Sequence, residues 1–478
     1  MTYIGWLLAV LFSTLHILGI ASAFHAILYA RTAQGAIVWS LSLLTFPYLT
    51  LPLYWTLARD KFQGYVKLLR ARTLSGDNYR QVEEWLRQLE QFRTPLSDER
   101  GNRAKVFESL ARLPFTRGNR VELLVDGEQA FGSMFQDIDK AKDYILLFFF
   151  IVRDDHIGNR LKEHLLEKAA QGVRIFFLYD ELGCMGLGAY IEELRRAGVE
   201  MMPFNTTQGS TNKLQYNFRN HRKITIIDGR VAFVGGMNVE DDTMGLNPFY
   251  GPWRDTHVRL EGPGVQGVQL VWMEDWYWAT RQLPKLEWTP RPCQDQDRDV
   301  LYLGTGPASQ LDAGVLFFVH SIDCARERVW ITSPYFVPDP SVIDSLILAS
   351  LRGVDVRIIL PQRWDMLVMY LAAFSYFPEI EGTDIRIFRY QAGHPHQKVM
   401  LVDNDIAWVG SANMDNRSMR LNFEGNLVVL GAEFATEVEE MLMRDLERSV
   451  EVGPEDYYSR GLIFKLGVKL ARLFSPIL

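Results

Sequence analysis

An internal repeat constrains this chain more than any other feature. Residues 221–238 (HRKITIIDGRVAFVGGMN) return as residues 396–413 (HQKVMLVDNDIAWVGSAN), 175 residues later and without a gap. Seven of the 18 positions are identical, and the apolar positions between them match in kind. This period is longer than that of any solenoid unit, so the repeat indicates two domain-sized halves.

The residues upstream of each copy predict the architecture of the halves. In both, an apolar strand with a turn precedes a helical stretch, and a second strand then opens with Gly-Val (144–155 and 172–179; 328–340 and 353–360). Strands that alternate with helices predict an α/β fold in which each half holds a mixed β-sheet flanked by helices. We expect the halves to span residues 119–295 and 296–455.

The first 58 residues predict a membrane anchor. Residues 4–29 and 36–58 are apolar runs of 26 and 23 residues, and either could cross about 30 Å of hydrocarbon as a helix. Arg31, in the turn between them, is the only charged residue before residue 59, and basic residues follow the second run. The positive-inside rule then predicts a transmembrane helical hairpin with both termini and the large domain in the cytoplasm.

Charge is graded away from this apolar end. Residues 59–118 form a basic membrane-proximal segment, whereas residues 121–478 carry a net charge of −14. A groove for nucleic acid must be basic, because it faces a phosphate backbone. The acidic body therefore argues against a nucleic-acid partner, including a nuclease's substrate.

The C-terminal tail, residues 456–478, is predicted to be basic and amphipathic. Lys465, Lys469 and Arg472 recur at helical intervals among Leu, Ile, Val and Phe. Such a helix is suited to an anionic membrane surface. A terminal helix packed on the body is the alternative.

Chemistry is concentrated in the repeat. Each copy places His and Lys two residues apart on a strand, so that both side chains project from the same face. His221, Lys223, His396 and Lys398, brought together, would surround one pocket. Imidazole can act as nucleophile, acid or base near neutral pH, and lysines can neutralise a phosphoryl group without a metal. Two structural histidines in a repeated hairpin are the alternative.

The aspartates of the repeat have a different parity. Asp228 and Asp403 follow their histidines by seven residues, an odd number, and each begins a good turn pair, Asp-Gly or Asp-Asn. Parity therefore predicts a structural role for them. Asn238 and Asn413 follow small residues that permit close backbone approach, and both can donate hydrogen bonds.

Nothing in the sequence points to a metal or a cofactor. The pair His394 and His396 lacks a third ligand, and the position of His396 in the repeat explains it better. The three cysteines, Cys184, Cys293 and Cys324, form no zinc or redox motif and favour a reducing compartment.

The two H-x-K-x4-D motifs resemble those of the phospholipase D superfamily. Further stretches, together with two apolar runs before a duplicated body, are similar to bacterial cardiolipin synthases (residues 216–238, 253–257, 333–338, 410–418 and 421–424). The resemblance covers nearly the whole chain, and residues 73–118 and the tail match least distinctively.

The resemblance implies a two-step phosphatidyl transfer. His221 would attack the phosphodiester and form a phosphatidyl-histidine, while His396 would protonate the leaving glycerol and then deprotonate the acceptor hydroxyl. The symmetry of the two motifs leaves this assignment of the two histidines open.

The resemblance also implies roles for other residues. Lys223 and Lys398, with Asn238, Asn413 and Ser411, would hold the phosphate, and Asp228 and Asp403 belong to the catalytic signature. An imidazole used in this way usually needs a carboxylate on its other nitrogen. Asp255 and Glu424, which lie 34 and 28 residues after the two histidines, are the candidates to orient them.

The expected function is the condensation of two phosphatidylglycerols into cardiolipin and glycerol. The alternatives are a phospholipase D-type hydrolase, or a phosphatidyltransferase with another donor or acceptor: phosphatidylethanolamine, water or serine. An inactive membrane scaffold is disfavoured because both motifs are intact. Lipid selectivity and oligomeric state are not predicted.

Overall fold

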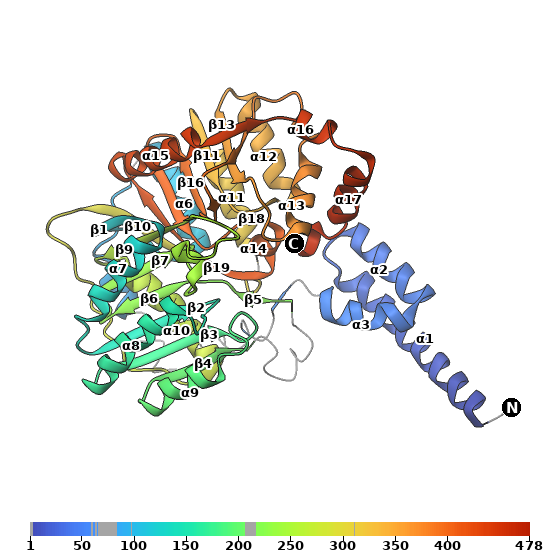
Figure 1. Ribbon diagram of the computed structural model, residues 1–478, viewed down its shortest axis with the longest axis horizontal. Coiled ribbons are helices and arrows are strands. Elements are labelled where there is room, and N and C mark those ends of the chain that lie inside the picture. The colour runs from blue at the N-terminus through green and yellow to red at the C-terminus, as the bar shows by residue number, and fades with distance from the viewer. Residues whose placement is uncertain are drawn as a thin grey trace.

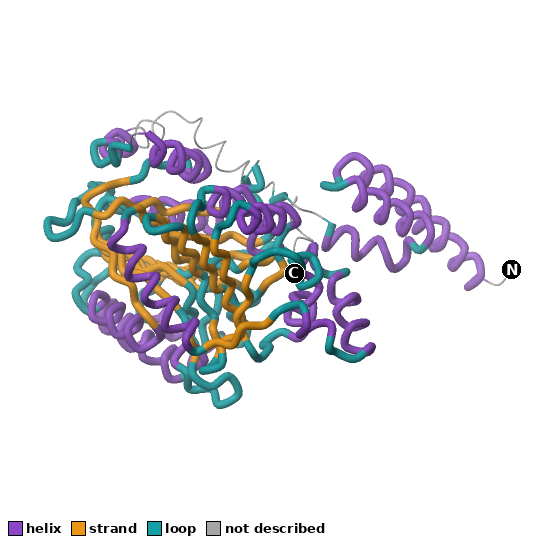
Figure 2. The backbone as a smooth tube through the Cα atoms, turned by 90° about the horizontal axis from the view of Figure 1, so that it is seen from above, coloured by secondary structure: helices purple, strands orange, loops and turns teal. Residues whose placement is uncertain are grey.

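The computed structural model describes residues 3–58, 61–62, 65, 84–96, 98–205, 217–309 and 311–478. A large body of strands and helices carries a narrow arm of helices, which ends at the N-terminus (Figures 1 and 2).

The body contains two sets of strands and helices, one for each half, which follow one another along the chain. The elements of the first half are β1 (Thr116–Val125), α7 (Asp126–Ile138), β2 (Tyr144–Phe149), α8 (His156–Ala170), β3 (Arg174–Asp180), α9 (Gly188–Arg196), β4 (Glu200–Phe204), β5 (Arg219–Asn220), β6 (Ile224–Ile227), β7 (Val231–Gly235), β8 (Trp253–Arg254), β9 (Thr256–Glu261) and α10 (Val265–Thr280). Those of the second half are β10 (Arg298–Thr305), α11 (Ala313–Asp323), β11 (Arg328–Thr332), β12 (Phe336–Val337), α12 (Pro340–Leu351), β13 (Asp355–Pro361), α13 (Leu367–Ala373), β14 (Arg386–Tyr390), β15 (His394–Pro395), β16 (Val399–Val402), β17 (Ile406–Gly410), β18 (Met414–Asp415), α14 (Asn416–Arg420), β19 (Asn422–Leu430), α15 (Ala432–Glu447) and β20 (Ser449–Val452), followed by α16 (Glu455–Tyr458) and α17 (Leu462–Arg472).

One 16-stranded sheet runs through both halves. Its order is β20-β14-β13-β11-β16-β17-β19-β10-β1-β9-β7-β6-β2-β3-β4, with β5 attached to β19. The halves join where β1 pairs antiparallel with β10, Thr116 opposite Val300. Outward from this junction the order β1-β9-β7-β6-β2-β3-β4 recurs as β10-β19-β17-β16-β11-β13-β14. The predicted α/β fold with duplicated mixed sheets is confirmed.

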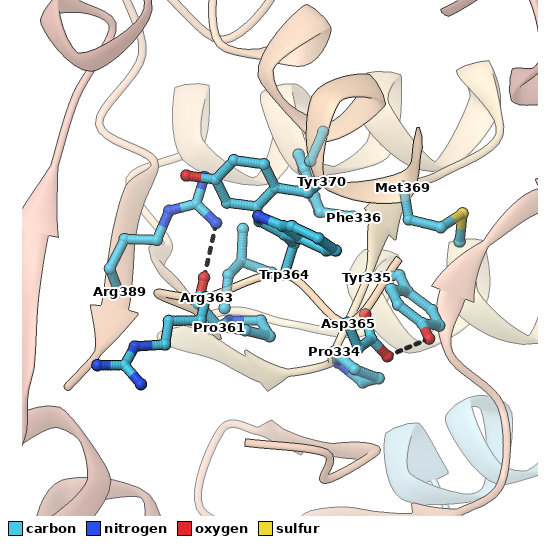
Figure 3. Close-up of a pocket in the computed structure, with 12 residues that line it drawn as sticks. Pro334, Tyr335, Phe336, Pro361, Arg363, Trp364, Asp365, Met369, Tyr370 and Arg389 are labelled. Carbon is cyan, nitrogen blue, oxygen red and sulfur yellow. Dashed lines mark hydrogen bonds between the residues drawn. The ribbon is translucent and has the colours of Figure 1, made fainter. Parts of the chain in front are cut away.

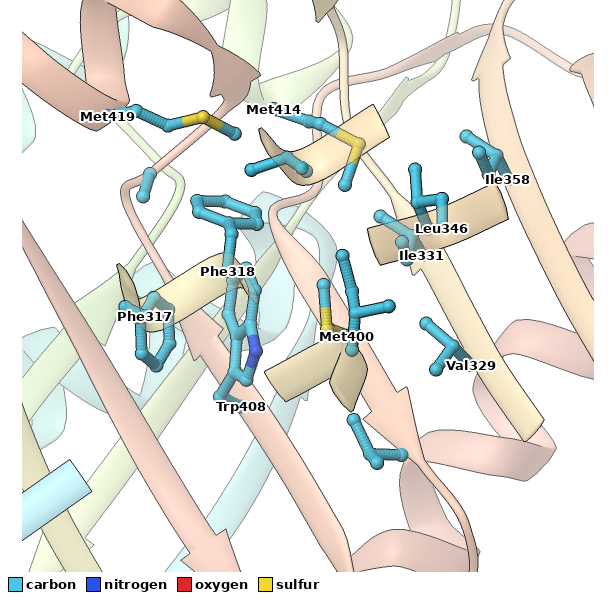
Figure 4. Close-up of a cluster of buried hydrophobic side chains, with 14 of the residues drawn as sticks. Phe317, Phe318, Val329, Ile331, Leu346, Ile358, Met400, Trp408, Met414 and Met419 are labelled. Carbon is cyan, nitrogen blue, oxygen red and sulfur yellow. The ribbon is translucent and has the colours of Figure 1, made fainter. Parts of the chain in front are cut away.

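Helices cover the sheet because its inner strands are apolar on both faces. β2, with the sequence YILLFF, is buried along its whole length, as expected for a strand with layers on both sides. In the second half, Phe317 and Phe318 of α11 pack their rings 5.0 and 5.4 Å from that of Trp408 in β17 (Figure 4). This packing on both faces holds the sheet in place, and so fixes the positions of the residues at the ends of its strands.

The first apolar run forms one long helix. α1 (Tyr3–Tyr29) has 27 residues, about 40 Å at the usual rise of a helix. Among the described residues it is the one helix long and apolar enough to cross a membrane.

The second apolar run does not form one span. It folds into α2 (Ala33–Thr45) and α3 (Pro47–Leu57), which are separated at Phe46. Pro47 is the first residue of α3, where its missing N–H is tolerated, but it cannot continue the hydrogen bonds of α2.

After this break the chain turns back along α1. Gly19 of α1 lies against Leu43 and Pro47 at the turning point. From there α3 returns toward the end of α1, where Tyr54 Oη lies 2.6 Å from His25 Nδ1. Polar contacts of this kind stabilise a folded-back segment within the membrane arm.

Both ends of this folded-back segment contact the same surface of the body. Arg31, just before α2, lies 3.5 Å from Asp339, and Lys61, beyond α3, lies 2.7 Å from Asp312. Arg420 of α14 binds both of these carboxylates. A turn that contacts the body cannot lie across the membrane from it. The second run is therefore two short helices that fold back beside α1, in place of the one continuous helix that the sequence predicts.

The basic segment 59–118 is only partly visible, since residues 59–60, 63–64, 66–83 and 97 lie outside the described residues. Its described parts pack on the body. Phe62 is fully buried, with its ring 4.9 Å from that of Trp278, and α6 (Asp98–Ala111) contacts β10 and α11.

The tail helix α17 packs on the body with one face and leaves an apolar face exposed, so it has features of both alternatives, a packed terminal helix and a membrane-surface helix. Val468 and Ala471 are buried where α17 packs on α13. Its other face leaves Leu462, Ile463 and Leu466 from 59 to 89% exposed. In both views α17 lies on the side of the body from which the N-terminal helices emerge (Figures 1 and 2).

Candidate active site

The two motif histidines lie where the halves meet. β5, which precedes His221, pairs with β19 of the second half, and the His221 amide donates to Phe423 O at 2.9 Å. β15, which precedes His396, pairs with β8 of the first half, and the His396 amide donates to Arg254 O at 2.7 Å. The backbone of each half thus holds the histidine of the other.

The carboxylates expected near the histidines are paired across the halves. His396 Nδ1 lies 2.8 Å from Asp255 Oδ2, and His221 Nδ1 lies 3.1 Å from Glu424 Oε2. Both carboxylates are fully buried. A proton on each Nδ1, donated to its carboxylate, leaves Nε2 with a lone pair for chemistry.

Each lysine reaches back to its own histidine. Lys223 Nζ donates to His221 O at 2.6 Å, and Lys398 Nζ donates to His396 O and lies 2.8 Å from His396 Nδ1. Burial lowers the pKa of Lys223 to about 7 and that of Lys398 to about 8. An anion between these ammonium groups would restore their full charge, so the site is suited to a phosphodiester.

The histidines share this desolvated environment. Burial lowers the pKa of His221, although the Glu424 carboxylate opposes the shift. Burial and then the Lys398 charge hold the pKa of His396 well below its usual value. Burial acts most strongly, to raise the pKa of Glu424, but contacts with His221, Lys223 and Ser411 together outweigh burial and lower it. Neutral imidazoles beside an ionised carboxylate suit nucleophilic attack.

The residue between each His and Lys binds a carboxylate on a helix and so anchors the segment that carries them. Arg222 Nη1 binds Asp275 Oδ2 of α10 at 2.6 Å, and Gln397 Nε2 binds Asp445 Oδ2 of α15 at 3.2 Å. The sequence analysis missed Asp275 and Asp445. Each lies in the helix that follows an equivalent strand, β9 or β19, and a comparison of these two helices could have identified them.

Asp228 and Asp403 lie away from the histidines. Asp228 accepts hydrogen bonds from the amides of residues 142, 143 and 144, which lead into β2. Asp403 does the same for residues 326, 327 and 328 before β11. Both have a positive φ, 51° and 52°. Each lies beyond the far end of the strand that His221 or His396 precedes. This position corrects the catalytic role that the resemblance attached to them and fits the turn that parity predicts.

Ser411 also differs from its expected phosphate-binding role. Its hydroxyl donates to Glu424 and accepts from the Gly425 amide at 3.0 Å. Ser411 is therefore placed to hold the carboxylate that faces His221.

The two asparagines differ from each other. Asn238 Nδ2 donates to Glu240 Oε1 at 3.2 Å, and its Oδ1 accepts from the Ile151 amide. Asn413 is buried, and its Oδ1 has no hydrogen-bond partner in the part of the chain that the structure describes. Among those same residues, no group of three or more His, Cys, Asp or Glu is arranged to hold a metal ion.

Comparison with known proteins matches both halves of the chain. The family described as "Cardiolipin synthase, PLD-like domain" matches residues 134–248 and 318–446, one segment in each half. Cardiolipin synthase A of Pseudomonas aeruginosa (strain LESB58) is 46% identical over 478 residues, 100% of this chain and 96% of its own. Cardiolipin synthase A of Pseudomonas syringae pv. syringae (strain B728a) is 45% identical over 472 residues, 97% of each chain.

A solved structure shares the fold. The crystal structure of phosphatidylserine synthase from Haemophilus influenzae Rd KW20 matches with a TM-score of 0.61 and 14% identity, over 79% of this chain and 100% of that one. The sequence matches span both catalytic halves and the N-terminal arm, and from them we conclude that this chain belongs to the cardiolipin synthase family of phospholipase D-like proteins.

Proposed function

We propose that this protein transfers a phosphatidyl group from one phosphatidylglycerol to another and so forms cardiolipin and glycerol. The crossed histidine–carboxylate pairs carry the proposal. His221 with Glu424 and His396 with Asp255 make two oriented imidazoles in one buried site. Two imidazoles are what a double displacement at phosphorus needs, one to bond to phosphorus and one to move protons.

In the first step, His221 Nε2 attacks the phosphorus of the donor lipid. The bond from phosphorus to the glycerol oxygen breaks as the P–N bond forms. His396, which takes up a second proton at Nε2 when the anionic phosphodiester enters the site, gives that proton to the glycerol oxygen. Glu424 stabilises the positive charge that develops on the His221 ring, as an oriented carboxylate does in hydrolase triads.

In the second step, the hydroxyl of an acceptor phosphatidylglycerol loses its proton to His396 Nε2. Its oxygen attacks phosphorus, and the P–N bond to His221 breaks. Lys223 and Lys398, with the side chains of Asn238 and Asn413, stabilise the charge on the non-bridging oxygens. Each such preorganised donor typically contributes about 10²–10³-fold in rate.

We place the body at the cytoplasmic face of the inner membrane. α1 crosses once. Arg31, just after α1, and Lys61, beyond α3, lie on the body side, which the positive-inside rule assigns to the cytoplasm. The exposed apolar face of α17 is suited to the same membrane surface.

The purified full-length protein in phosphatidylglycerol vesicles tests the reaction. We expect cardiolipin and glycerol in equal amounts, measured by mass spectrometry. Phosphatidic acid as the sole lipid product would instead identify a hydrolase. Cardiolipin formation that requires added phosphatidylethanolamine would change the donor.

The first prediction concerns divalent ions. Activity should be unchanged in EDTA, because Lys223 and Lys398 neutralise the phosphate. The measurement is cardiolipin formation before and after the chelator, with vesicle integrity as the control. Loss of activity that added Mg²⁺ or Ca²⁺ restores would contradict the lysine-based site.

The second prediction concerns membrane topology. In a variant with Cys293→Ser, a cysteine introduced at Tyr3 and one introduced at Thr32 should lie on opposite sides of the inner membrane. A membrane-impermeant maleimide added from the periplasmic side should label Tyr3→Cys, and it should label Thr32→Cys only after lysis. Labelling of Thr32→Cys alone in intact cells would instead support two complete spans.

A further inference from the structure

A carboxylate follows each of the two site asparagines by two residues. Glu240 follows Asn238 in the first half, and Asp415 follows Asn413 in the second, so the two acids are equivalent in the repeat. Asp415 is 1% exposed, and the Glu240 side chain is 14% exposed. Buried carboxylates need hydrogen-bond donors close by, and the proposed transfer has so far used neither of these two.

Each asparagine lies against a backbone segment that continues from a strand of the sheet. In the first half Val239 forms a bridge with Val152, just beyond β2. In the second half Met414 makes the equivalent contact with β12, just beyond β11. The residue that precedes this contact is Ile151 in the first half and Tyr335 in the second. Their backbone amides therefore have equivalent places beside the two asparagines.

The side-chain amide of Asn238 is held at both of its ends. Its Oδ1 accepts a hydrogen bond from the Ile151 amide at 3.3 Å, and its Nδ2 donates one to Glu240 Oε1 at 3.2 Å. An amide nitrogen has two hydrogens, so Nδ2 can donate a second hydrogen bond to a phosphate oxygen. Together the two contacts determine which end of the amide is the nitrogen.

The side-chain amide of Asn413 lacks the first of these contacts. Its Oδ1 has no hydrogen-bond partner within the described ranges of the chain. The equivalent backbone amide, that of Tyr335, donates instead to Ser333 Oγ at 3.3 Å. The Tyr335 side chain is turned toward Asp365, whose Oδ2 accepts from its hydroxyl at 2.6 Å (Figure 3). The oxygen end of Asn413 is thus not fixed in the way that Ile151 fixes that of Asn238.

Asp415 is left to orient Asn413. Its Oδ1 accepts from the Ser418 amide at 2.6 Å and so caps α14. Burial raises the pKa of Asp415 to about 6, and a hydrogen bond from the Asn413 side chain acts to lower it. The carboxylate therefore contacts both the start of the helix and the asparagine.

The charge of both carboxylates decides which end of the amide they bind. Burial raises the pKa of Glu240 to about 7, and Asp242 acts in the same direction. Arg153, whose Nε lies 3.9 Å from Glu240 Oε2, opposes the shift, as does Lys223. Above its pKa each group is ionised, and an ionised carboxylate accepts hydrogen bonds but cannot donate them. Each therefore selects the nitrogen end of its asparagine.

We propose that Glu240 and Asp415 are positioning residues for phosphatidyl transfer. Each turns the amide nitrogen of its asparagine toward the phosphodiester, so that Nδ2 donates to a non-bridging oxygen. The amide oxygen in that place would repel the same anion. The terminal torsion of an asparagine is broad and roughly two-fold, so both orientations are open to it without a carboxylate. The inference rests on the proposed function, in which Asn238 and Asn413 bind those oxygens, and deepens it.

Substitution of Asp415 in the full-length protein tests the proposal. The measurement is kcat for total phosphatidyl release, cardiolipin plus phosphatidic acid, from phosphatidylglycerol vesicles at a pH above the pKa of both carboxylates. Asp415→Asn keeps the cap, because Asn and Asp cap helices about equally well. Its amide nitrogen is a donor, however, and favours the reversed Asn413 amide. We expect kcat to fall about 10- to 100-fold and KM to change less. Asp344→Asn, exposed on α12, is the matched control and should behave as the unchanged protein.

A double-mutant cycle distinguishes positioning from a purely structural role. Asn413→Ala removes the amide that Asp415 orients, so Asp415→Asn added to it should cause no further loss of kcat. Glu240→Gln should lower kcat less than Asp415→Asn does, because the Ile151 amide still holds the oxygen of Asn238. An unchanged kcat in Asp415→Asn, or the same loss with and without Asn413→Ala, would overturn the proposal.

The first half supplies a second test if Asp415→Asn does not fold. Glu240→Leu removes the acceptor of Asn238 Nδ2 and should lower kcat about 3- to 10-fold, but not in the Asn238→Ala background. The same loss in both backgrounds, or none in either, would overturn the proposal. An unchanged protein that releases phosphatidic acid and no cardiolipin would refute the proposed function alone, because total phosphatidyl release still reports on the positioning residues.

Discussion

Replacement of either motif histidine by alanine should abolish phosphatidyl transfer, with a loss of about 10⁴- to 10⁶-fold in turnover. His221→Ala removes the atom that bonds to phosphorus. His396→Ala removes the group that protonates the leaving glycerol and deprotonates the acceptor. The measurement is the initial rate of cardiolipin formation. His164→Ala is the matched control, because His164 is on the surface, bound to Asp139.

The two variants should fail at different steps. With a donor lipid whose leaving group needs no proton, such as a nitrophenyl ester, His396→Ala should still form a phosphatidyl-histidine, and His221→Ala should not. Acid-labile label retained on the protein reports this intermediate. Label on His221→Ala, or near-native turnover of either variant, would contradict the assigned roles.

Substitution of the buried carboxylates should be nearly as severe. Asp255→Asn and Glu424→Gln should each lower kcat by about 10²- to 10⁴-fold, because an amide can hold the wrong imidazole tautomer and cannot stabilise the charged ring. The lipid KM should change less than kcat, since the lysines that hold the phosphate remain. Glu261→Gln, at the half-buried end of the β9 strand, is the control.

The crossed geometry adds a spectroscopic readout to this prediction. The imidazole ¹⁵N shifts of His396 should change in Asp255→Asn, and those of His221 should change in Glu424→Gln. A purely structural carboxylate would alter both rings or neither. Changes within the same half, Asp255 with His221, would contradict the crossed arrangement.

Much of the site could be predicted from local periodicity. Alternation of side chains along an extended chain predicts that His221 and Lys223 share a face, and the structure places them just before β6. The same holds for His396 and Lys398, just before β16. The odd spacing of Asp228 and Asp403 predicts a turn, and both bind the backbone amides that lead into a neighbouring strand. The repeat likewise predicts two halves, because it can be found by comparing the sequence with itself.

Partners that are distant in sequence could not be predicted in this way. The spacing of Asp255 after His221 suggests a pairing within one half, whereas β8 and β15 join Asp255 to His396 across the halves. The sequence predicts that Ser411 binds phosphate, whereas in the structure its hydroxyl donates a hydrogen bond to Glu424. Asp275 and Asp445 carry no local signal strong enough to identify them, because their function depends on a strand far along the chain.

The N-terminal helices also show which features follow from the sequence and which depend on tertiary contacts. Apolar length and composition predict from the sequence that residues 3–57 lie in a bilayer, and strand and helix periodicity predict the duplicated α/β body. Hydropathy cannot tell a second span from a re-entrant pair, because both bury the same side chains in lipid. Contacts between distant residues make that choice: the break at Pro47 lets α3 fold back on α1, and Asp312 and Asp339 hold Arg31 and Lys61 on one face of the body. The catalytic pairs are likewise formed by tertiary contacts, since the energy that orients each imidazole comes from a carboxylate that approaches only when the two halves close on each other.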